Sequence, residues 1–103
     1  MGLEELWVTQ INQLRNQDEF IGFYLLKELE IKQTNANPPK DYLDIVLCDS
    51  TGEIPAKLWD ASSTDKETFF PMGLVKVRGI VQTYREKLQV KIVQMRLAKP
   101  EDG

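Results

Sequence analysis

Hydrophobic and polar residues alternate along most of this chain, with the period of two that a β-strand with one buried face produces. The clearest example is "YLDIVLCDSTGEIPAKLWD", residues 42–60, in which apolar residues at every second position flank the polar segment "DSTG". The pattern predicts two antiparallel strands joined by a loop of about four residues. Symmetric pairing about this loop brings Leu47 opposite Ile54 and Leu43 opposite Leu58, all on one face.

The other face of this predicted hairpin carries two further cross-strand pairs. Asp44 faces Lys57, and Tyr42 faces Trp59. Opposite charges and paired aromatic rings are favourable neighbours, worth about 0.2–1 kcal/mol each. A slip of one residue would turn every apolar side chain of the hairpin outward. The sequence therefore predicts the register as well as the strands.

The segment before the hairpin predicts one long, curved strand. Residues 20–34, "FIGFYLLKELEIKQT", are rich in aromatic and apolar residues, and Gly22 suits a bend or bulge. Residues 35–41, "NANPPKD", predict a loop, because the two prolines have no N–H to donate to a ladder. Nearer the N-terminus, apolar residues at spacings of three and four predict a helical stripe that packs on this domain or on another one: Leu3, Leu6, Trp7, Ile11 and Leu14.

The segment after the hairpin predicts a short helix and two more strands. Within residues 62–73, Thr64 and Glu67 have the spacing of a capping box. Residues 74–84 and 88–95 alternate again and are separated by the tight connection "REK". The whole chain thus predicts the order β, β, β, short α, β, β.

This order predicts an all-β fold: a five-stranded OB-fold Greek-key barrel with one short helix between strands 3 and 4, plus an N-terminal helical or irregular segment. A two-sheet sandwich would leave the helix unexplained, and SH3-like barrels usually lack it. We expect residues 1–19 to form the N-terminal segment, residues 20–97 the OB-fold domain and residues 98–103 a tail.

The composition excludes several kinds of catalytic site. The 103 residues suffice for one domain, contain no histidine and include one cysteine, Cys48. Histidine-based catalysis, histidine metal centres and an internal disulfide are therefore excluded. The scattered glycines form no phosphate loop. We expect a chain that is not an enzyme by itself and that binds neither a cofactor nor a metal.

Two features bear on the compartment. No apolar run approaches the roughly 20 residues of a membrane span. Near the N-terminus, Glu4 and Glu5 stand where a secretory signal would carry positive charge. We therefore expect a cytoplasmic protein with no membrane partner.

The net charge of -3 hides a strong asymmetry. Residues 68–99 contain seven basic residues and one acidic residue, whereas residues 1–67 contain six basic and thirteen acidic residues. Phosphate contacts need a basic surface, so the C-terminal third is where a nucleic-acid-binding function would place its cations.

Four segments resemble a known family. "GFYLLK" (22–27), "YLDIVLCDSTGEIPAKLWD" (42–60), "PMGLVKVRGIVQTY" (71–84) and "KLQVKI" (87–92) are similar to the N-terminal OB-fold domain of the YhaM-type 3'-to-5' exoribonucleases, also called the CMP-binding-factor family. The resemblance extends from about Ile11 to Leu97. In that family hydrolysis belongs to a C-terminal HD domain with His and Asp metal ligands. The resemblance therefore implies the substrate-binding part of such an enzyme, with an HD-type nuclease domain as its partner in the parent protein.

Two functions remain open at this point. The first is binding of single-stranded RNA or DNA, in which exposed aromatic rings stack on bases and cations meet phosphates. The second is a protein–protein interaction or homo-oligomerisation module, in which the outer aromatics and the N-terminal stripe pack on a partner, and Lys57 merely pairs with Asp44. The candidate nucleic-acid-binding residues are Lys32, Lys40, Tyr42, Lys57, Trp59, Tyr84, Arg85, Lys87 and Lys91.

Overall fold

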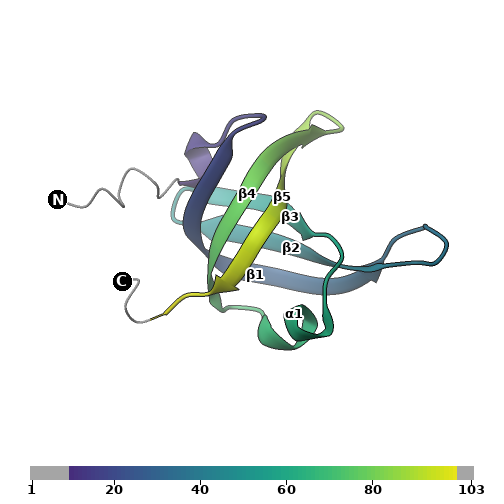
Figure 1. Cartoon of the computed structure of the whole chain (residues 1–103). Coiled ribbons are helices and arrows are strands. Elements are labelled where there is room, and N and C mark those ends of the chain that lie inside the picture. Colours follow the sequence, from purple (N-terminus) through teal and green to yellow (C-terminus); the bar gives the residue numbers. More distant parts are fainter. Residues whose placement is uncertain (1–9, 100–103) are drawn as a thin grey trace.

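Five strands close into a barrel of order β1-β2-β3-β5-β4 within residues 10–99, the part of the chain that the computed structural model describes (Figure 1). One short α-helix follows the third strand, so the predicted OB-fold architecture is confirmed. Within these residues no helix is long and apolar enough to cross a membrane. The elements are the 3-10 helix η2 (Ile11–Gln13), β1 (Glu19–Gln33), β2 (Asp41–Asp49), β3 (Gly52–Leu58), α1 (Ser63–Thr68), β4 (Leu74–Tyr84) and β5 (Lys87–Leu97).

Strand β1 is long enough to pair with two neighbours in succession. Its first half, Glu19 to Leu25, pairs with β4, and its second half, Leu25 to Gln33, pairs with β2. The ladder with β2 is interrupted at Lys27 and not at Gly22, where the sequence suggested the bend.

Gly22 instead makes room for a buried ring. A Cβ at this position would lie 2.1 Å from the hydroxyl oxygen of Tyr24, a side chain that is only 2% exposed. The residue is glycine because the Tyr24 ring lies over its backbone.

The β2–β3 hairpin has the predicted register, including Leu43 opposite Leu58 and Asp44 opposite Lys57. Its loop has two residues and not four, since Asp49 still pairs with Gly52. The inward-facing residues of this hairpin are buried with those of the other strands in one core, which includes Leu26, Leu43, Ile45, Leu47, Ile54, Ala56, Val75, Val77, Val81, Val90 and Ile92.

The N-terminal stripe contributes to the same core. Ile11 and Leu14 are buried, and the described part of the stripe forms one 3-10 turn. The backbone N–H of Ile11 donates to Oδ2 of Asp49 at 2.9 Å, which joins η2 to the β2–β3 turn. Leu3, Leu6 and Trp7 lie outside the described residues.

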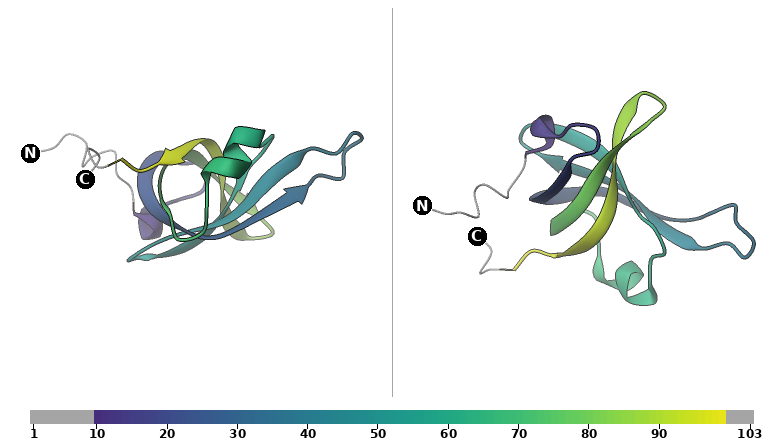
Figure 2. Two further views of the ribbon diagram at one scale, coloured as in Figure 1. Left: turned by 90° about the horizontal axis from the view of Figure 1, so that it is seen from below. Right: turned by 45° about the horizontal axis from the view of Figure 1, so that its top comes forward.

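Helix α1 lies at the end of the barrel away from the β4–β5 turn (Figures 1 and 2). Its capping box is formed by Ser62 and Asp65, and not by Thr64 and Glu67. The backbone N–H of Asp65 donates to the Ser62 hydroxyl, and that of Ser62 donates to the Asp65 carboxylate, both at 3.0 Å. The N-cap therefore lies two residues before the predicted one.

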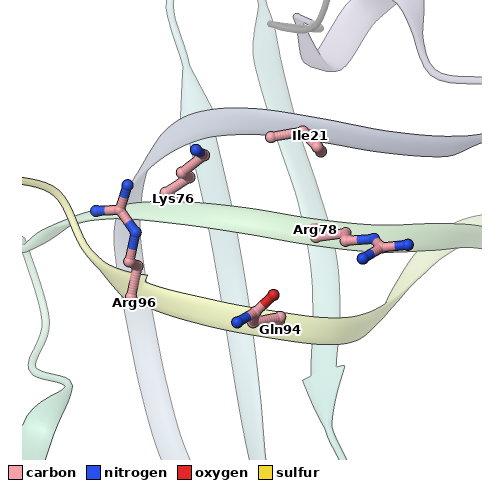
Figure 3. A pocket seen from close by; sticks show the side chains of 5 residues that line it. All are labelled: Ile21, Lys76, Arg78, Gln94 and Arg96. Carbon is pink, nitrogen blue, oxygen red and sulfur yellow. The ribbon is translucent and has the colours of Figure 1, made fainter. Parts of the chain in front are cut away.

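Strand β5 contains a bulge at Val93. Arg78 pairs with Gln94 and the next residue, Gly79, pairs with Ile92, so Val93 has no partner of its own in this ladder. A bulge reverses the alternation of the residues that follow it. Gln94 and Arg96 consequently lie on the outer face of the sheet (Figure 3), and the residues that alternate with them, Met95 and Leu97, pack against the core.

Candidate nucleic-acid interface

Tyr42 and Trp59 form an aromatic pair on the outside of the β2–β3 hairpin. Their ring centroids are 4.6 Å apart and the planes are tilted by 41°, which confirms the predicted cross-strand contact. Tyr42 is half-buried, whereas Trp59 is 39% exposed. The indole is in contact with the Tyr42 ring and still presents surface to solvent. We call this pair the aromatic shelf.

Two lysines beside the shelf share one carboxylate. Nζ of Lys32 lies 2.6 Å from Oδ2 of Asp44, and Nζ of Lys57 lies 3.4 Å from Oδ1. Partial burial raises the pKa of Asp44, but the hydrogen bond from Lys32 and the charge of Lys57 outweigh it, so the pKa is lowered. Lys57 Nζ also lies 5.9 Å from the centroid of the Tyr42 ring. The three ionised groups together carry a net charge of +1.

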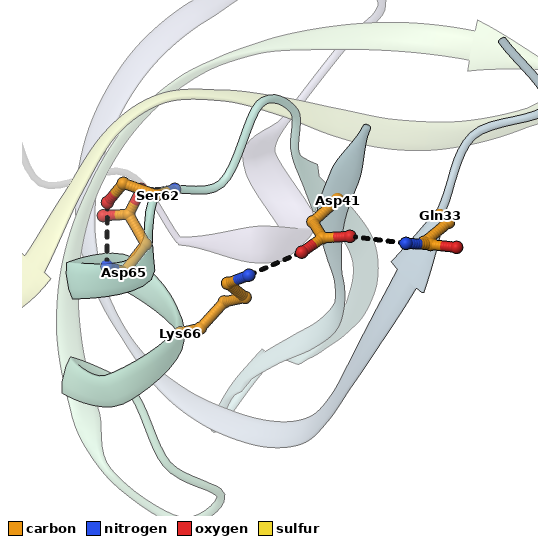
Figure 4. Close-up of polar contacts among 5 residues, drawn as sticks. All are labelled: Gln33, Asp41, Ser62, Asp65 and Lys66. Carbon is orange, nitrogen blue, oxygen red and sulfur yellow. Dashed lines mark hydrogen bonds and ion pairs between the residues drawn. The ribbon is translucent and has the colours of Figure 1, made fainter. Parts of the chain in front are cut away.

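Asp41, the residue before Tyr42, forms several polar contacts beside the shelf (Figure 4). Its carboxylate accepts hydrogen bonds from Lys66 Nζ at 2.5 Å and from Gln33 Nε2 at 3.1 Å, and these bonds lower its pKa. Its backbone carbonyl accepts from the N–H of Ala61 at 3.0 Å. One residue thus ties β1, helix α1 and the segment after Trp59 to the start of β2.

Two further predicted lysines flank the shelf on different sides. Lys91 on β5 is exposed and is the register partner of Lys57 in the parallel β3–β5 ladder. Lys40, in the loop before β2, lies 3.5 Å from Asp60, the residue that follows Trp59. Lys91 forms no ion pair with any of residues 10–99, so its charge is not compensated there by a neighbouring carboxylate.

The remaining predicted residues lie at the β4–β5 turn. The Arg85 guanidinium carbon is 5.2 Å from the centroid of the exposed Tyr84 ring. Arg85 and Glu86 have φ values of 51° and 67°, as a tight two-residue turn requires. Lys87 follows this turn and is exposed.

The predicted residues therefore form two groups. The β4–β5 turn and the β1–β2 loop project from the barrel in different directions (Figure 1). The structure gathers Lys32, Lys40, Tyr42, Lys57, Trp59 and Lys91 around the shelf, and places Tyr84, Arg85 and Lys87 at the turn.

Sequence reasoning missed a third set of polar residues. A hollow of about 190 Å³ on the outer face of β1, β4 and β5 is lined by Ile21, Lys76, Arg78, Gln94 and Arg96 (Figure 3). If the alternation of Val90 and Ile92 continued along the strand, Gln94 and Arg96 would lie in the core. Only the excess of basic residues in this third of the chain pointed toward the hollow.

The described residues provide no metal centre. Among residues 10–99, no group of three or more His, Cys, Asp or Glu side chains is placed to hold a metal ion. The acidic residues near the shelf are engaged with lysines, as described above.

Solved OB-fold domains have the same architecture. The second OB-fold domain of replication protein A from Methanococcus maripaludis superposes with a TM-score of 0.73 at 15% identity, covering 88% of this chain and 94% of that domain. The OB domain of Ta0387 from Thermoplasma acidophilum gives 0.72 at 9% identity, with coverages of 89% and 87%. A replication protein A heterotrimer bound to ssDNA gives 0.61 at 15% identity, with coverages of 89% and 66%. At these identities the similarity shows the fold alone.

Sequence comparison is more specific. The chain is 44% identical over 86 residues to the 3'-5' exoribonuclease YhaM of Oceanobacillus iheyensis, and 42% identical over 85 residues to that of a Geobacillus species. The chain is homologous to the N-terminal quarter of the YhaM exoribonucleases. The match covers 84% of this chain and 26% of the Oceanobacillus protein, so the chain spans about a quarter of the length of these curated relatives. No protein-family model matches it.

Proposed function

We propose that this chain is a single-stranded nucleic-acid-binding module, the substrate-binding domain of a 3'-to-5' exoribonuclease whose catalytic HD domain is not part of it. The observation that carries the proposal is the aromatic shelf, a Tyr42–Trp59 pair in which the tryptophan is 39% exposed. The homology to one quarter of YhaM enzymes supports the link to RNA, and the architecture shared with a replication protein A bound to ssDNA supports single-stranded ligands.

The shelf suits a stacking role because every base has a π-face. Stacking of one base on an aromatic side chain contributes about 1–3 kcal/mol and depends little on sequence. The contact with Tyr42 holds the Trp59 ring in place before a base arrives, which reduces the entropy lost on binding.

The cations around the shelf suit phosphate contacts. Lys91 has no ion-pair partner within the described chain, whereas Lys32 and Lys57 are held by Asp44. A strand that stacks a base on Trp59 would place its phosphates within reach of these ammonium groups. Since few of them are uncompensated, the affinity should be modest and should fall as salt concentration rises.

The test uses Trp59 as its own reporter. In a Trp7→Phe background, Trp59 is the sole tryptophan, and titration with an oligonucleotide of about ten nucleotides should quench its fluorescence. Anisotropy with a labelled oligonucleotide, at two salt concentrations, should show that Trp59→Ala weakens binding by about fivefold or more.

The matched control is Phe70→Ala, which truncates an aromatic side chain of similar exposure, 52%, away from the shelf. This variant should bind as tightly as the parent chain. Equal loss in both variants, or no binding by the parent chain at high micromolar concentration, would reject the proposal.

A second candidate function is docking to another protein domain. It is favoured by an exposed apolar group between α1 and β4, formed by Phe70, Met72 and Leu74, which are 52%, 65% and 59% exposed. Light scattering of the parent chain and of a Phe70→Ser/Leu74→Ser variant tests it. A larger mass for the parent chain only, with no oligonucleotide binding by either, would favour docking.

A further inference from the structure

We propose that an apolar groove at the end of β5 is the surface on which the catalytic domain of the parent enzyme packs. The groove has a volume of about 510 Å³ and is lined by Phe70, Gly73, Leu74, Leu97, Ala98 and Lys99. This inference rests on the proposed function, because it requires that the chain is one domain of a longer exoribonuclease. It gives the exposed apolar group between α1 and β4 a specific partner.

The groove lies where the last strand of the barrel ends. Val75 pairs with Leu97, and the backbone N–H of Ala98 donates to the carbonyl oxygen of Leu74 at 2.9 Å. Figure 1 shows the end of β5 beside the start of β4, at the end of the barrel where α1 lies. Polypeptide that follows β5 therefore starts from the groove.

The length of the relatives points to the occupant. The match covers 26% of the Oceanobacillus enzyme and corresponds to its N-terminal quarter. The remaining part of that enzyme therefore follows the segment that matches β5. A short connection keeps two domains at an effective concentration of about a millimolar, so a modest apolar contact is enough to hold the following domain against the groove.

The apolar side chains are presented on a fixed backbone. The N–H of Met72 donates to the carbonyl oxygen of Leu26 at 2.6 Å, and the N–H of Leu26 donates to that of Gly73 at 2.8 Å. A Cβ on Gly73 would lie 2.9 Å from the Phe70 ring, so the ring rests against this backbone. A surface that is ordered in advance loses little conformational entropy when a partner binds.

Met72 has a backbone conformation that favours glycine. Its φ is 72°, in the left-handed region where other residues are uncommon, and the residue is 65% exposed. The side chain therefore gains little packing within residues 10–99 in return for this conformation. Methionine is frequent at binding surfaces because its flexible thioether chain adapts to the partner. A contact outside the barrel explains an exposed methionine here.

The groove differs from the aromatic shelf in chemistry and in position. Apart from Lys99, its lining is apolar or glycine, and contiguous exposed apolar surface marks contacts with protein. It is formed by β4, β5 and the α1–β4 connection, whereas Tyr42 and Trp59 belong to the β2–β3 hairpin. A nucleic-acid strand and the catalytic domain would thus use different parts of the barrel.

The test is hydroxyl-radical footprinting of the isolated chain and of a chimaera in which this chain replaces the N-terminal quarter of Oceanobacillus YhaM. Phe70 and Met72 should be oxidised severalfold more slowly in the chimaera, because the catalytic domain covers them. Tyr84, which is 48% exposed at the β4–β5 turn, should react equally in both proteins. Equal oxidation of Phe70 and Met72 in the two proteins would overturn the inference.

Two double variants of the chimaera show whether the groove itself is responsible. Phe70→Ser/Leu74→Ser should return the oxidation of Met72 to the rate of the isolated chain. The matched control, Ile31→Ser/Val93→Ser, replaces residues that are 54% and 50% exposed and do not line the groove. It should keep Met72 protected. Protection that survives in the first variant, or that is lost equally in both, would overturn the inference.

Folding is checked by circular dichroism. If Phe70→Ser/Leu74→Ser does not fold, Met72→Gln replaces it, with the oxidation of Phe70 as the readout. If the chimaera does not fold, full-length Oceanobacillus YhaM is compared with its N-terminal quarter at the positions that align with Phe70 and Met72. The same slower oxidation in the full-length enzyme is expected, and equal rates would contradict the proposal.

Two measurements separate this inference from the others. Light scattering that shows a dimer of the isolated chain, with Met72 protected in the dimer and exposed on dilution, would assign the groove to a second copy and overturn the inference. Trp59→Ala should leave the footprint unchanged. Protection of Met72 in the chimaera without oligonucleotide binding would reject the shelf and support the groove, whereas binding without protection would do the reverse.

Discussion

Lys57 and Lys91 are register partners in the parallel ladder between β3 and β5, so their side chains leave neighbouring strands on the same outer face of the barrel. Asp44 compensates the first of them. Repulsion between the two lysines lowers the stability of the fold slightly, and their charges add to the positive charge beside the aromatic shelf. A mutation of one lysine can therefore change stability and nucleic-acid binding in opposite directions.

Lys91→Glu should raise stability and weaken nucleic-acid binding. The new carboxylate would face Lys57, and an opposite-charge pair on a sheet contributes about 0.2–1 kcal/mol. Urea denaturation should show a slightly higher midpoint, while anisotropy should show affinity for a ten-nucleotide strand reduced severalfold. A variant with both lower stability and unchanged binding would contradict the assignment of Lys91 to the interface.

Asp44→Asn should have the opposite pattern. It removes the carboxylate that Lys32 and Lys57 share, so stability should fall by about 0.5–1 kcal/mol, as for partly exposed ion pairs. The two freed ammonium groups should tighten binding about two- to fivefold at low salt and steepen the salt dependence. If titrations at two salt concentrations show weaker binding, the lysines act only within the fold.

Acid should destabilise the barrel in a defined window. Hydrogen bonds from Lys66 and Gln33 lower the pKa of Asp41 below the ordinary value of 3.8. For Asp49, burial raises the pKa, but hydrogen bonds from Thr51 and from backbone N–H groups outweigh it. A carboxylate with a lowered folded-state pKa stabilises the fold above the unfolded-state value, and this contribution is lost as pH falls through the folded-state value.

The melting temperature should therefore hold steady from pH 7 to about pH 5 and fall below about pH 4. Each 1 kcal/mol lost should lower it by about 4–8 °C in a domain of this size. Asp49→Asn should melt lower at neutral pH and lose less on acidification. A parent chain that is equally stable at pH 6 and pH 2.5 would show that these carboxylates contribute nothing.

Gly22→Ala should destabilise the barrel by about 1–3 kcal/mol, the usual cost of overpacking a core. The new methyl group would lie 2.1 Å from the Tyr24 hydroxyl oxygen, and the buried ring has little space to move. Chemical denaturation measures the change. Gly22→Ala/Tyr24→Leu should lose less than the sum of its two single variants, and strict additivity would argue against the contact.

Glu86→Gly should stabilise the β4–β5 turn by about 0.5–1 kcal/mol, because Glu86 has a φ of 67° and glycine adopts positive φ without steric cost. Glu28→Gly in β1 is the matched control, and it should lose a similar amount because its backbone is extended. Denaturation midpoints that shift in the same direction for both variants would contradict this explanation.

The β2–β3 hairpin shows why part of this structure was predictable. Alternation on both sides of a short turn leaves one register that buries all the apolar residues, and the Tyr42–Trp59 contact follows from that register. The fold class followed from the number and order of such segments and from the single helix between them.

The missed features depend on contacts between distant segments. Either alternation of residues 93–97 is compatible with the local sequence, and only pairing with β4 places the extra residue at Val93. Helix α1 is capped by Ser62 and Asp65, and its Lys66 donates a hydrogen bond to Asp41, which is 25 residues away in the chain. The separation of the β4–β5 turn from the shelf likewise required the curvature of the whole barrel (Figure 1).

Because β1 pairs with both β2 and β4, the barrel cannot close before β4 has been synthesised. Phe20 near the start of the first strand pairs with Gly79, so the seam between β1 and β4 joins segments made far apart in time on the ribosome. Contacts between distant segments slow folding, because the intervening chain must be organised first. A nascent chain that ends before β4 has an open sheet edge along the first half of β1, and it must wait for the last third of the sequence before that edge is covered.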